Sequence, residues 1–220
     1  MLRSPGNVIV LSHDDVAHEL GPVGAWLDTQ KATVQRVSRG SAITLPDADL
    51  LIVMGSPLSV ANGYCAPPQQ QEIELVRSWV AADRPYLGIC FGAQVLAKAL
   101  GGQVERMNGT HRSYEPLKTD VSELAGRWAL WHEDAITAPA TSQVHAREPH
   151  ADVAFSRGRA WGLQIHIEFT AEIVERLGQR MNVTDDDWRW LVESLGQESE
   201  SIEPRVFSLL DMIWSRMVAV

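Results

Sequence analysis

Short apolar runs alternate with amphipathic stretches along the first half of the chain. The apolar runs are rich in Val, Ile and Leu and lie at residues 7–12, 33–37, 49–57 and 84–90. Stretches with helical spacing lie after Gly21 and Pro22, over residues 69–82 and over residues 91–100. Apolar residues at every third or fourth position indicate helices, whereas short β-branched runs indicate strands. The alternation predicts an α/β fold in which helices cover a parallel sheet.

The second half of the chain has a different pattern. Residues 104–169 are predicted to form short strands with turns, including a hairpin centred on Gly158. From Thr170 the spacing is helical again, over residues 171–181, 184–196 and 204–218. Thr184 and Asp187 resemble a capping box with Asp in place of the usual Glu. At 220 residues, a single domain with one good core is expected.

Composition and charge limit the classes of molecule that the chain is expected to bind. The formal net charge is −9, which disfavours binding to nucleic acid or to an anionic membrane. No secretory leader precedes the run at residues 8–12, and no apolar run approaches the roughly 18 residues that span a bilayer. The two cysteines, Cys65 and Cys90, cannot make a disulfide framework. We therefore expect a cytoplasmic protein without membrane or nucleic-acid partners.

A cysteine lies between the fourth apolar run and the helical stretch that follows it. Residues 86–102 read YLGICFGAQVLAKALGG, so glycines stand two positions before and two positions after Cys90. A strand, a tight Gly-x-Cys-x-Gly turn and a helix have the geometry of a nucleophile elbow. The helix N-terminus lowers the pKa of a thiol there, and the N–H of Phe91 can donate to an oxyanion. The alternative is that Cys90 is a small buried apolar residue at a strand end.

A second motif supplies groups that a catalytic thiolate needs. His166 and Glu168 stand two residues apart in GLQIHIEF. On a strand this spacing places both side chains on the same face, roughly 6–7 Å apart at Cα, so that the carboxylate can contact the imidazole. Beside an elbow cysteine, His166 becomes a candidate base and Glu168 the group that orients it.

Together these motifs resemble the class I, triad-type glutamine amidotransferases. That family shows G-x-C-x-G-x-Q at the elbow and a later G-x-Q-x-H-x-E strand. VMGSPLSV around Gly55 resembles its Gly-Gly-Pro oxyanion loop, YEP around Glu115 a strand after the elbow helix, and WHED (residues 131–134) the loop that closes over glutamine. The ordered set covers residues 7 to 170 and is most similar to a stand-alone relative of the GMP-synthase amidotransferase.

The resemblance implies a fold and a division of the chain. The fold is a flavodoxin-like α/β fold with a mainly parallel central sheet and helices on both faces. Residues 1–170 form the amidotransferase domain, and residues 171–220 form a C-terminal helical extension of the same domain. The extension could be a lid, a docking surface for a synthase or the interface of a homodimer, and the sequence leaves these alternatives open.

The resemblance also assigns roles to individual residues. Cys90 attacks the side-chain amide of glutamine, His166 moves the proton to ammonia, and Glu168 polarises the imidazole. Water then hydrolyses the glutamyl thioester. The oxyanion lies between the backbone N–H of Phe91 and that of Gly55 or Ser56, whereas Gln94 and the backbone around Glu133 and Asp134 bind the substrate.

Three positions depart from the family pattern. Ile167 stands where the family often has Pro, which leaves the His-to-Glu spacing unchanged. Ser56 replaces the second glycine of the oxyanion loop and is compatible only with a backbone that does not need positive φ. Residues 131–134 read WHED where Ser-His-Gly-Asp is usual, so a glycine is lost from the seat of the substrate.

Other residues are given structural interpretations. The seven histidines show no H-x-x-x-H or Cys/His ligand spacing, and His145 and His150 are expected at the surface. Cys65 is interpreted as an incidental thiol, and Trp188, Trp190 and Trp214 as core or interface contacts of the tail helices. We expect no metal, because the histidines lack ligand spacing, and no cofactor; without a Walker or Rossmann motif, nothing in the chain is expected to activate an acceptor with ATP.

The sequence therefore predicts a cysteine hydrolase that releases ammonia from glutamine or a related γ-glutamyl amide. A synthase subunit could receive the ammonia. Two alternatives stay open: a γ-glutamyl peptide or conjugate hydrolase with the same triad, which the altered residues 131–134 favour slightly, and a non-catalytic binding or regulatory member of the family.

Overall fold

A seven-stranded sheet forms the centre of the computed structural model, which describes residues 4–40, 45–181, 183 and 188–219. Its strands, in spatial order, are β2 (Thr33–Ser38), β1 (Asn7–Ser12), β3 (Leu50–Val53), β4 (Tyr86–Ile89), β9 (Ala160–Leu163), β8 (Ala151–Arg157) and β7 (Gln143–Glu148). The first five are parallel to one another, and β8 and β7 are joined at one edge by antiparallel pairing, β8 with β9 and β7 with β8. The mainly parallel sheet expected from the sequence is therefore confirmed.

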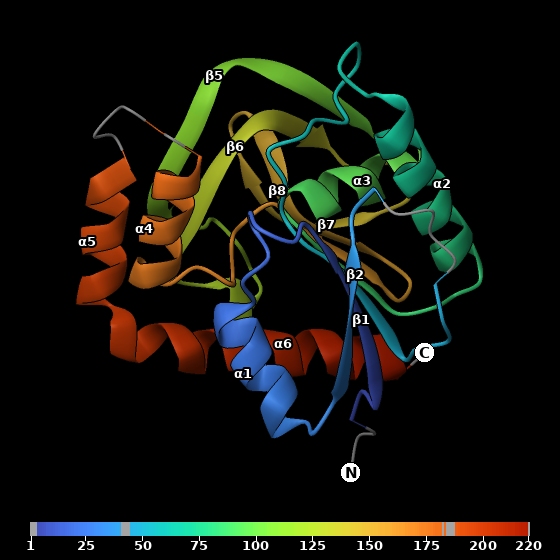
Figure 1. Ribbon diagram of the computed structural model, residues 1–220, viewed down its shortest axis with the longest axis horizontal. Helices are drawn as coiled ribbons and strands as arrows, with labels where there is room; N and C mark the ends of the chain where they lie inside the picture. The colour runs from blue at the N-terminus through green and yellow to red at the C-terminus, as the bar shows by residue number, and fades with distance from the viewer. Residues whose placement is uncertain (1–3, 41–44, 182, 184–187, 220) are drawn as a thin grey trace.

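Helices cover both faces of this sheet (Figure 1). One face packs against α1 (Gly21–Thr29) and α6 (Ser199–Val218), and the other against α2 (Pro67–Ala81) and α3 (Phe91–Ala99). Alternate residues of β1 separate accordingly: Val8 and Val10 join the first core, whereas Ile9 and Leu11 join the second. This is the period-two alternation of a strand whose two faces are both buried.

Two further helices and an antiparallel ribbon complete the fold. Helices α4 (Ala171–Arg180) and α5 (Arg189–Gln197) pack against each other and add to the core that α1 and α6 cover. Strands β5 (Gln103–Pro116) and β6 (Arg127–Thr137) form a separate two-stranded sheet, which arches across one end of the central sheet in Figure 1. A short 3₁₀ helix, η1 (Ser122–Leu124), connects them.

The strands and helices expected in the first half of the chain are present within a few residues of their predicted bounds, and the hairpin around Gly158 joins β8 to β9. The last helix differs, because α6 begins at Ser199 and continues through Pro204. Its start is tied to the ribbon, since the Tyr114 hydroxyl donates to Glu198, the residue that precedes the helix, at 2.8 Å. The capping box expected at residues 184–187 lies outside the described residues.

A second difference concerns the predicted strand that carries His166 and Glu168. Strand β9 ends at Leu163, and the chain beyond it makes a single bridge between His166 and Ala129 of β6. The segment leaves the sheet because its partner is the ribbon, which lies at the end of the sheet. Within the described residues, no helix is both long and apolar enough to cross a bilayer.

Candidate active site

Cys90 occupies the single residue between β4 and α3. Its backbone has φ 50° and ψ −105°, a conformation that costs of order 1–3 kcal/mol for a residue with a side chain. The strain is held in place by the flanking elements: the Cys90 N–H donates to the Leu163 carbonyl at 2.7 Å, and its own carbonyl accepts from the first turn of α3. The predicted elbow is therefore present, with the thiol at the carboxyl end of the sheet.

The two glycines of the elbow are required by close backbone contact. A Cβ atom on Gly88 would lie 2.4 Å from the backbone carbon of Gly92, and a Cβ atom on Gly92 would lie 2.1 Å from the Val53 carbonyl oxygen. Both distances are shorter than any real contact of a Cβ atom. The Tyr86 hydroxyl, itself fully buried, donates to the Gly92 carbonyl at 2.8 Å. The start of α3 is thereby fixed against β3 and β4.

His166 and Glu168 form a buried pair. Nδ1 of His166 donates to Oε1 of Glu168 at 2.7 Å, and the imidazole stacks on the Phe169 ring. The other nitrogen, Nε2, lies 3.2 Å from the carbonyl oxygen of Trp131. A carboxylate and a carbonyl both accept hydrogen bonds, so this geometry favours a ring that is protonated on both nitrogens.

The electrostatics of the pair agree with this protonation state. Burial by itself would lower the pKa of His166, but the charge of Glu168 and the neighbouring Cys90 outweigh it and raise the pKa well above its usual value. An opposite charge in contact favours the charged form of a group. The arrangement therefore keeps a proton on His166 beside the thiol.

The Cys90 sulfur lies among polar groups. The Nε2 amide of Gln164 donates to Sγ at 3.5 Å, and the Trp131 carbonyl lies 3.7 Å from Sγ. Gln94, one helical turn after the cysteine, contacts Oε1 of Gln164 at 3.4 Å, and both glutamines are buried. Sequence analysis did not assign Gln164 a role, although it stands two residues before His166 in the same motif.

The residues expected to bind an oxyanion surround the same point. Helix geometry leaves the N–H of Phe91, the first residue of α3, without an intrahelical acceptor. A Cβ atom on Gly55 would lie 3.6 Å from Cε1 of His166 and 3.8 Å from Cβ of Cys90, so this backbone faces the thiol. Ser56 does not have positive φ, and its hydroxyl contacts Nε2 of His13 at 2.8 Å. The serine is therefore compatible with the loop.

A buried ion pair that sequence patterns did not predict holds that loop. Arg39, just after β2, donates to Glu72 of α2 at 3.0 Å, and the two side chains are only 4% and 3% exposed. The same guanidinium donates to the carbonyls of Met54 and Gly55 at 3.0 and 2.9 Å. Arg39 thus fixes the backbone that faces Cys90.

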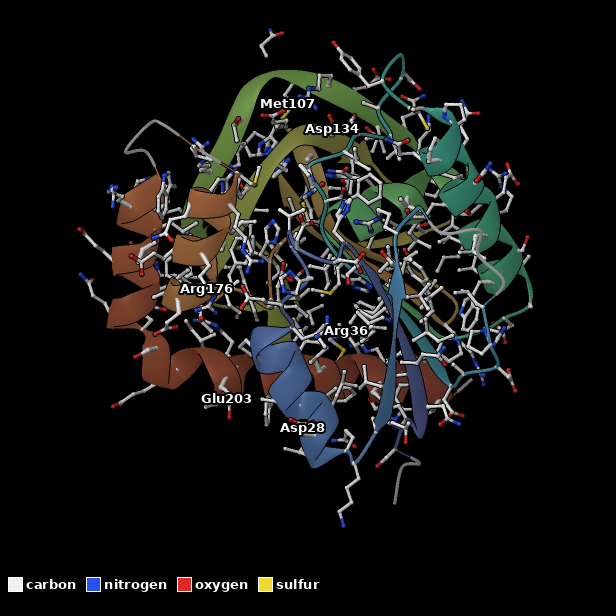
Figure 2. All side chains as sticks on the ribbon, viewed as in Figure 1. Asp28, Arg36, Met107, Asp134, Arg176 and Glu203 are labelled. Carbon is white, nitrogen blue, oxygen red and sulfur yellow. The ribbon has the colours of Figure 1, made fainter. Side chains whose placement is uncertain are left out.

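Glu133 and Asp134 lie on β6, and their carboxylates are already engaged. Asp134 is buried and accepts from the Ser59 hydroxyl at 2.6 Å and from Arg106 at 3.2 Å. Glu133 accepts from Thr110 at 2.9 Å and also pairs with Arg106. Figure 2 shows Asp134 on the β5–β6 ribbon. Both carboxylates are therefore occupied by partners within the protein.

A pocket of about 680 Å³, including its open mouth, brings most of these groups together. It is lined by seven of the nine predicted site residues: Cys90, His166, Gly55, Ser56, Gln94, Glu133 and Asp134. Glu168 lies behind His166, and Phe91 is fully buried below the pocket. An apolar rim formed by Phe169, Leu177 and Met181 completes the lining.

Two interpretations of histidines need correction. His145 is not at the surface: it is buried, stacks on Trp161 and contacts the Ser156 hydroxyl at 2.8 Å. His150 is half-buried and lies beside His111 and His132, so that one potential ligand atom from each falls within 4.8 Å of the others. Sequence spacing could not show this group, because its members come from three different segments.

The remaining interpretations concern Cys65 and the tryptophans. Cys65 is half-buried, and burial raises the pKa of its thiol, which fits an unreactive residue. Trp188 and Trp214 are core residues, whereas Trp190 is 38% exposed. Trp190 therefore does not belong to the core.

Comparison with known proteins gives a consistent result. The sequence model of the family "Glutamine amidotransferase class-I" matches residues 16–176. GMP synthase (glutamine-hydrolyzing) of Aeropyrum pernix is 31% identical over 183 residues, which cover 76% of this chain and 33% of that protein. The putative glutamine amidotransferase-like protein YfeJ of Salmonella typhimurium is 28% identical over 70% of this chain and 72% of its own length.

Among solved structures, a glutamine amidotransferase from Thermotoga maritima superposes with a TM-score of 0.81, covering 95% of this chain and 98% of that one at 22% identity. The fold and the elbow define an α/β protein with a cysteine at the carboxyl end of a parallel sheet. The family match extends over most of the chain, so the protein belongs to the class-I glutamine amidotransferases. It spans about a third of the length of the GMP synthase that it matches.

Proposed function

We propose that this chain hydrolyses the side-chain amide of glutamine through a glutamyl thioester on Cys90. The observation that carries the proposal is the convergence of the strained cysteine, the buried His166–Glu168 pair and the Gly55 backbone at one end of a single pocket. A thiolate, a proton donor and an oxyanion site are the groups that acyl transfer from an amide requires.

The proposed reaction starts from a thiolate and an imidazolium. The two acceptors beside its ring favour a doubly protonated His166, and the Gln164 amide points a donor at Sγ, which suits a negatively charged sulfur. The thiolate attacks the amide carbon, and the oxyanion accepts from the N–H of Phe91 and from that of Gly55 or Ser56. His166 then gives its Nε2 proton to the leaving ammonia, and water attacks the thioester with His166 now acting as base.

The glutamine itself would lie along β6. The Trp131 carbonyl is already beside both Sγ and Nε2 of His166, so the strand that follows it borders the reacting atoms. We infer that backbone groups around Glu133 and Asp134 hold the α-amino and α-carboxylate groups of the substrate, with Gln94 bordering its side chain. Both carboxylates keep their bonds to Arg106 in this arrangement.

Labelling with a diazo-ketone analogue of glutamine tests the proposal. The analogue alkylates a competent thiolate, and mass spectrometry locates the adduct. We expect modification of Cys90 that excess glutamine prevents. Cys65→Ala should be labelled as the wild type is, because that thiol is remote from the pocket, whereas Cys90→Ala should give no adduct.

The opposite result has a clear meaning. If the analogue does not modify Cys90 but iodoacetamide does, the thiol is accessible and the glutamine-binding site is absent. That outcome would refute glutamine hydrolysis and favour a non-catalytic role. Circular dichroism of Cys90→Ala checks that the loss of label does not come from loss of fold.

A second candidate is hydrolysis of a γ-glutamyl conjugate. It is favoured by the apolar rim of Phe169, Leu177 and Met181, which extends the pocket beyond the polar groups and could contact a larger leaving group. Turnover of γ-glutamyl-p-nitroanilide faster than that of glutamine would support this candidate. Slower turnover would exclude it.

We also infer that a synthase receives the ammonia. The support is that the matched part of the Aeropyrum pernix GMP synthase amounts to a third of that protein. Glutamine turnover by the isolated chain distinguishes an enzyme that needs a partner from a stand-alone hydrolase. Labelling without turnover indicates that a partner must complete the site. Labelling with turnover indicates a stand-alone hydrolase.

A further inference from the structure

Three histidines from different elements meet beside the pocket. His111 and His132 are paired directly across β5 and β6, and His150 lies in the tight turn between β7 and β8. One potential ligand nitrogen from each imidazole lies within 4.8 Å of the others. Imidazole nitrogen is a preferred ligand of zinc, copper, nickel and iron.

Two of the nitrogens are already at the separation that a shared metal ion demands. Nε2 of His132 and Nε2 of His150 are 3.4 Å apart. In a tetrahedral zinc site with Zn–N bonds of about 2.05 Å, two ligand nitrogens stand about 3.3 Å apart. The three ligand nitrogens lie within 4.8 Å of one another, so His111 needs to approach by up to about 1.5 Å.

The tautomer of His132 suits a ligand. Its Nδ1 lies 2.9 Å from the Asp134 carbonyl oxygen, which only accepts, so Nδ1 carries the proton. The lone pair of Nε2 is therefore aimed at His150. A ring N–H bound to a backbone carbonyl is the usual support of a metal-bound imidazole. His111 is likewise held, with its Nε2 3.2 Å from the Ser113 hydroxyl.

The partial exposure of two of the three histidines allows a metal ion to reach them. His132 is 4% exposed and forms the floor of the group, whereas His111 and His150 are half-buried. A metal bound by all three would keep a coordination position toward solvent. This pattern of three protein nitrogens and one open position is that of a zinc ion with a bound water.

We propose that His111, His132 and His150 bind one divalent transition-metal ion of the zinc type, with water as the fourth ligand. The site lies next to the proposed glutamine seat, because His132 stands between Trp131 and Glu133 on the strand that borders the pocket. Metal binding would fix that strand. The binding itself does not depend on the proposed hydrolysis.

The test is a titration of the whole chain, prepared without a polyhistidine tag and dialysed against EDTA and then metal-free buffer. Calorimetry with ZnCl₂ should give one equivalent and a dissociation constant of about 10 μM or below. Co²⁺ should give the visible d–d bands of a tetrahedral complex. Neither readout involves glutamine, so failure here is distinguishable from failure of the proposed reaction.

Variants decide whether the three histidines are the ligands. His111→Gln and His150→Gln should each weaken Zn²⁺ binding at least about tenfold, because each removes one imidazole. His18→Gln, outside the group, should bind as the wild type does. Half-buried positions are chosen so that the fold survives, and circular dichroism checks this. Absence of saturable binding, or unchanged affinity in either variant, would overturn the proposal.

Discussion

The Arg39–Glu72 ion pair provides a sharp test of how the site is held. In Arg39→Met, a side chain of similar length still covers the Phe91 ring, over which the guanidinium now lies at 4.6 Å. The variant leaves the Glu72 carboxylate, 3% exposed, without its cation, and it removes the donors to the carbonyls of Met54 and Gly55.

The expected loss of stability in Arg39→Met follows from the burial of the ion pair. Removing one partner of a buried ion pair destabilises a protein by about 3–5 kcal/mol, because the other charge stays desolvated. We therefore expect Arg39→Met to lower the free energy of unfolding in urea by about that amount. Adding Glu72→Leu should recover most of the loss, since an apolar pair of similar volume is often as stable as a buried ion pair.

A matched pair at the surface supplies the control. Arg176 and Glu19 are also bonded, at 2.7 Å, but their side chains are 46% and 29% exposed. Arg176→Met should cost less than about 1 kcal/mol. Equal losses in Arg39→Met and Arg176→Met would refute the reasoning. Slower labelling of Cys90 in the stabilised double variant would show that the two carbonyl contacts, rather than the charge, position the loop.

Three further predictions concern the elbow and the imidazole. Gly92→Ala should prevent stable folding, because its Cβ would lie 2.1 Å from a backbone oxygen, whereas Gly196→Ala, with 3.9 Å to its nearest neighbour, should be neutral or slightly stabilising in thermal melts. Tyr86→Phe should cost about 1–3 kcal/mol in urea, since a buried carbonyl loses its donor; an unchanged midpoint would contradict this. The pKa of His166, followed by NMR, should fall in Glu168→Gln, because the carboxylate helps to raise it. The stabilisation from that pair is complete below about pH 6.5 and is lost as pH rises through the folded-state pKa, so the stability difference between wild type and Glu168→Gln should shrink with rising pH.

Local sequence patterns predicted the sheet and the elbow because both depend on neighbouring residues. The Gly-x-Cys-x-Gly turn is specified within five positions, and the His166–Glu168 contact needs a spacing of only two, which the bent segment outside the sheet also brings together. Helix and strand periodicity are likewise local properties.

The Arg39–Glu72 ion pair and the His111–His132 contact were not predicted, because each depends on pairing between segments that are distant in the sequence. Arg39 meets Glu72 only because β2 lies at the sheet edge next to β1 and α2 packs on the face beside it. His111 and His132 become neighbours through the register of an irregular ribbon, which shifts between Arg106 and His111. No spacing in the sequence encodes that register, since bulges change which residues face each other.

The hydrogen bond between Trp26 and Asp211 has a consequence for synthesis of the chain. The indole of α1 donates to the α6 carboxylate at 2.8 Å across 185 positions of sequence. A ribosome delivers β1, β3 and β4 long before α6, so until then only α1 covers this face of the nascent sheet. Apolar surface exposed for that long favours aggregation or chaperone binding. Completion of this core therefore waits for the synthesis of α6.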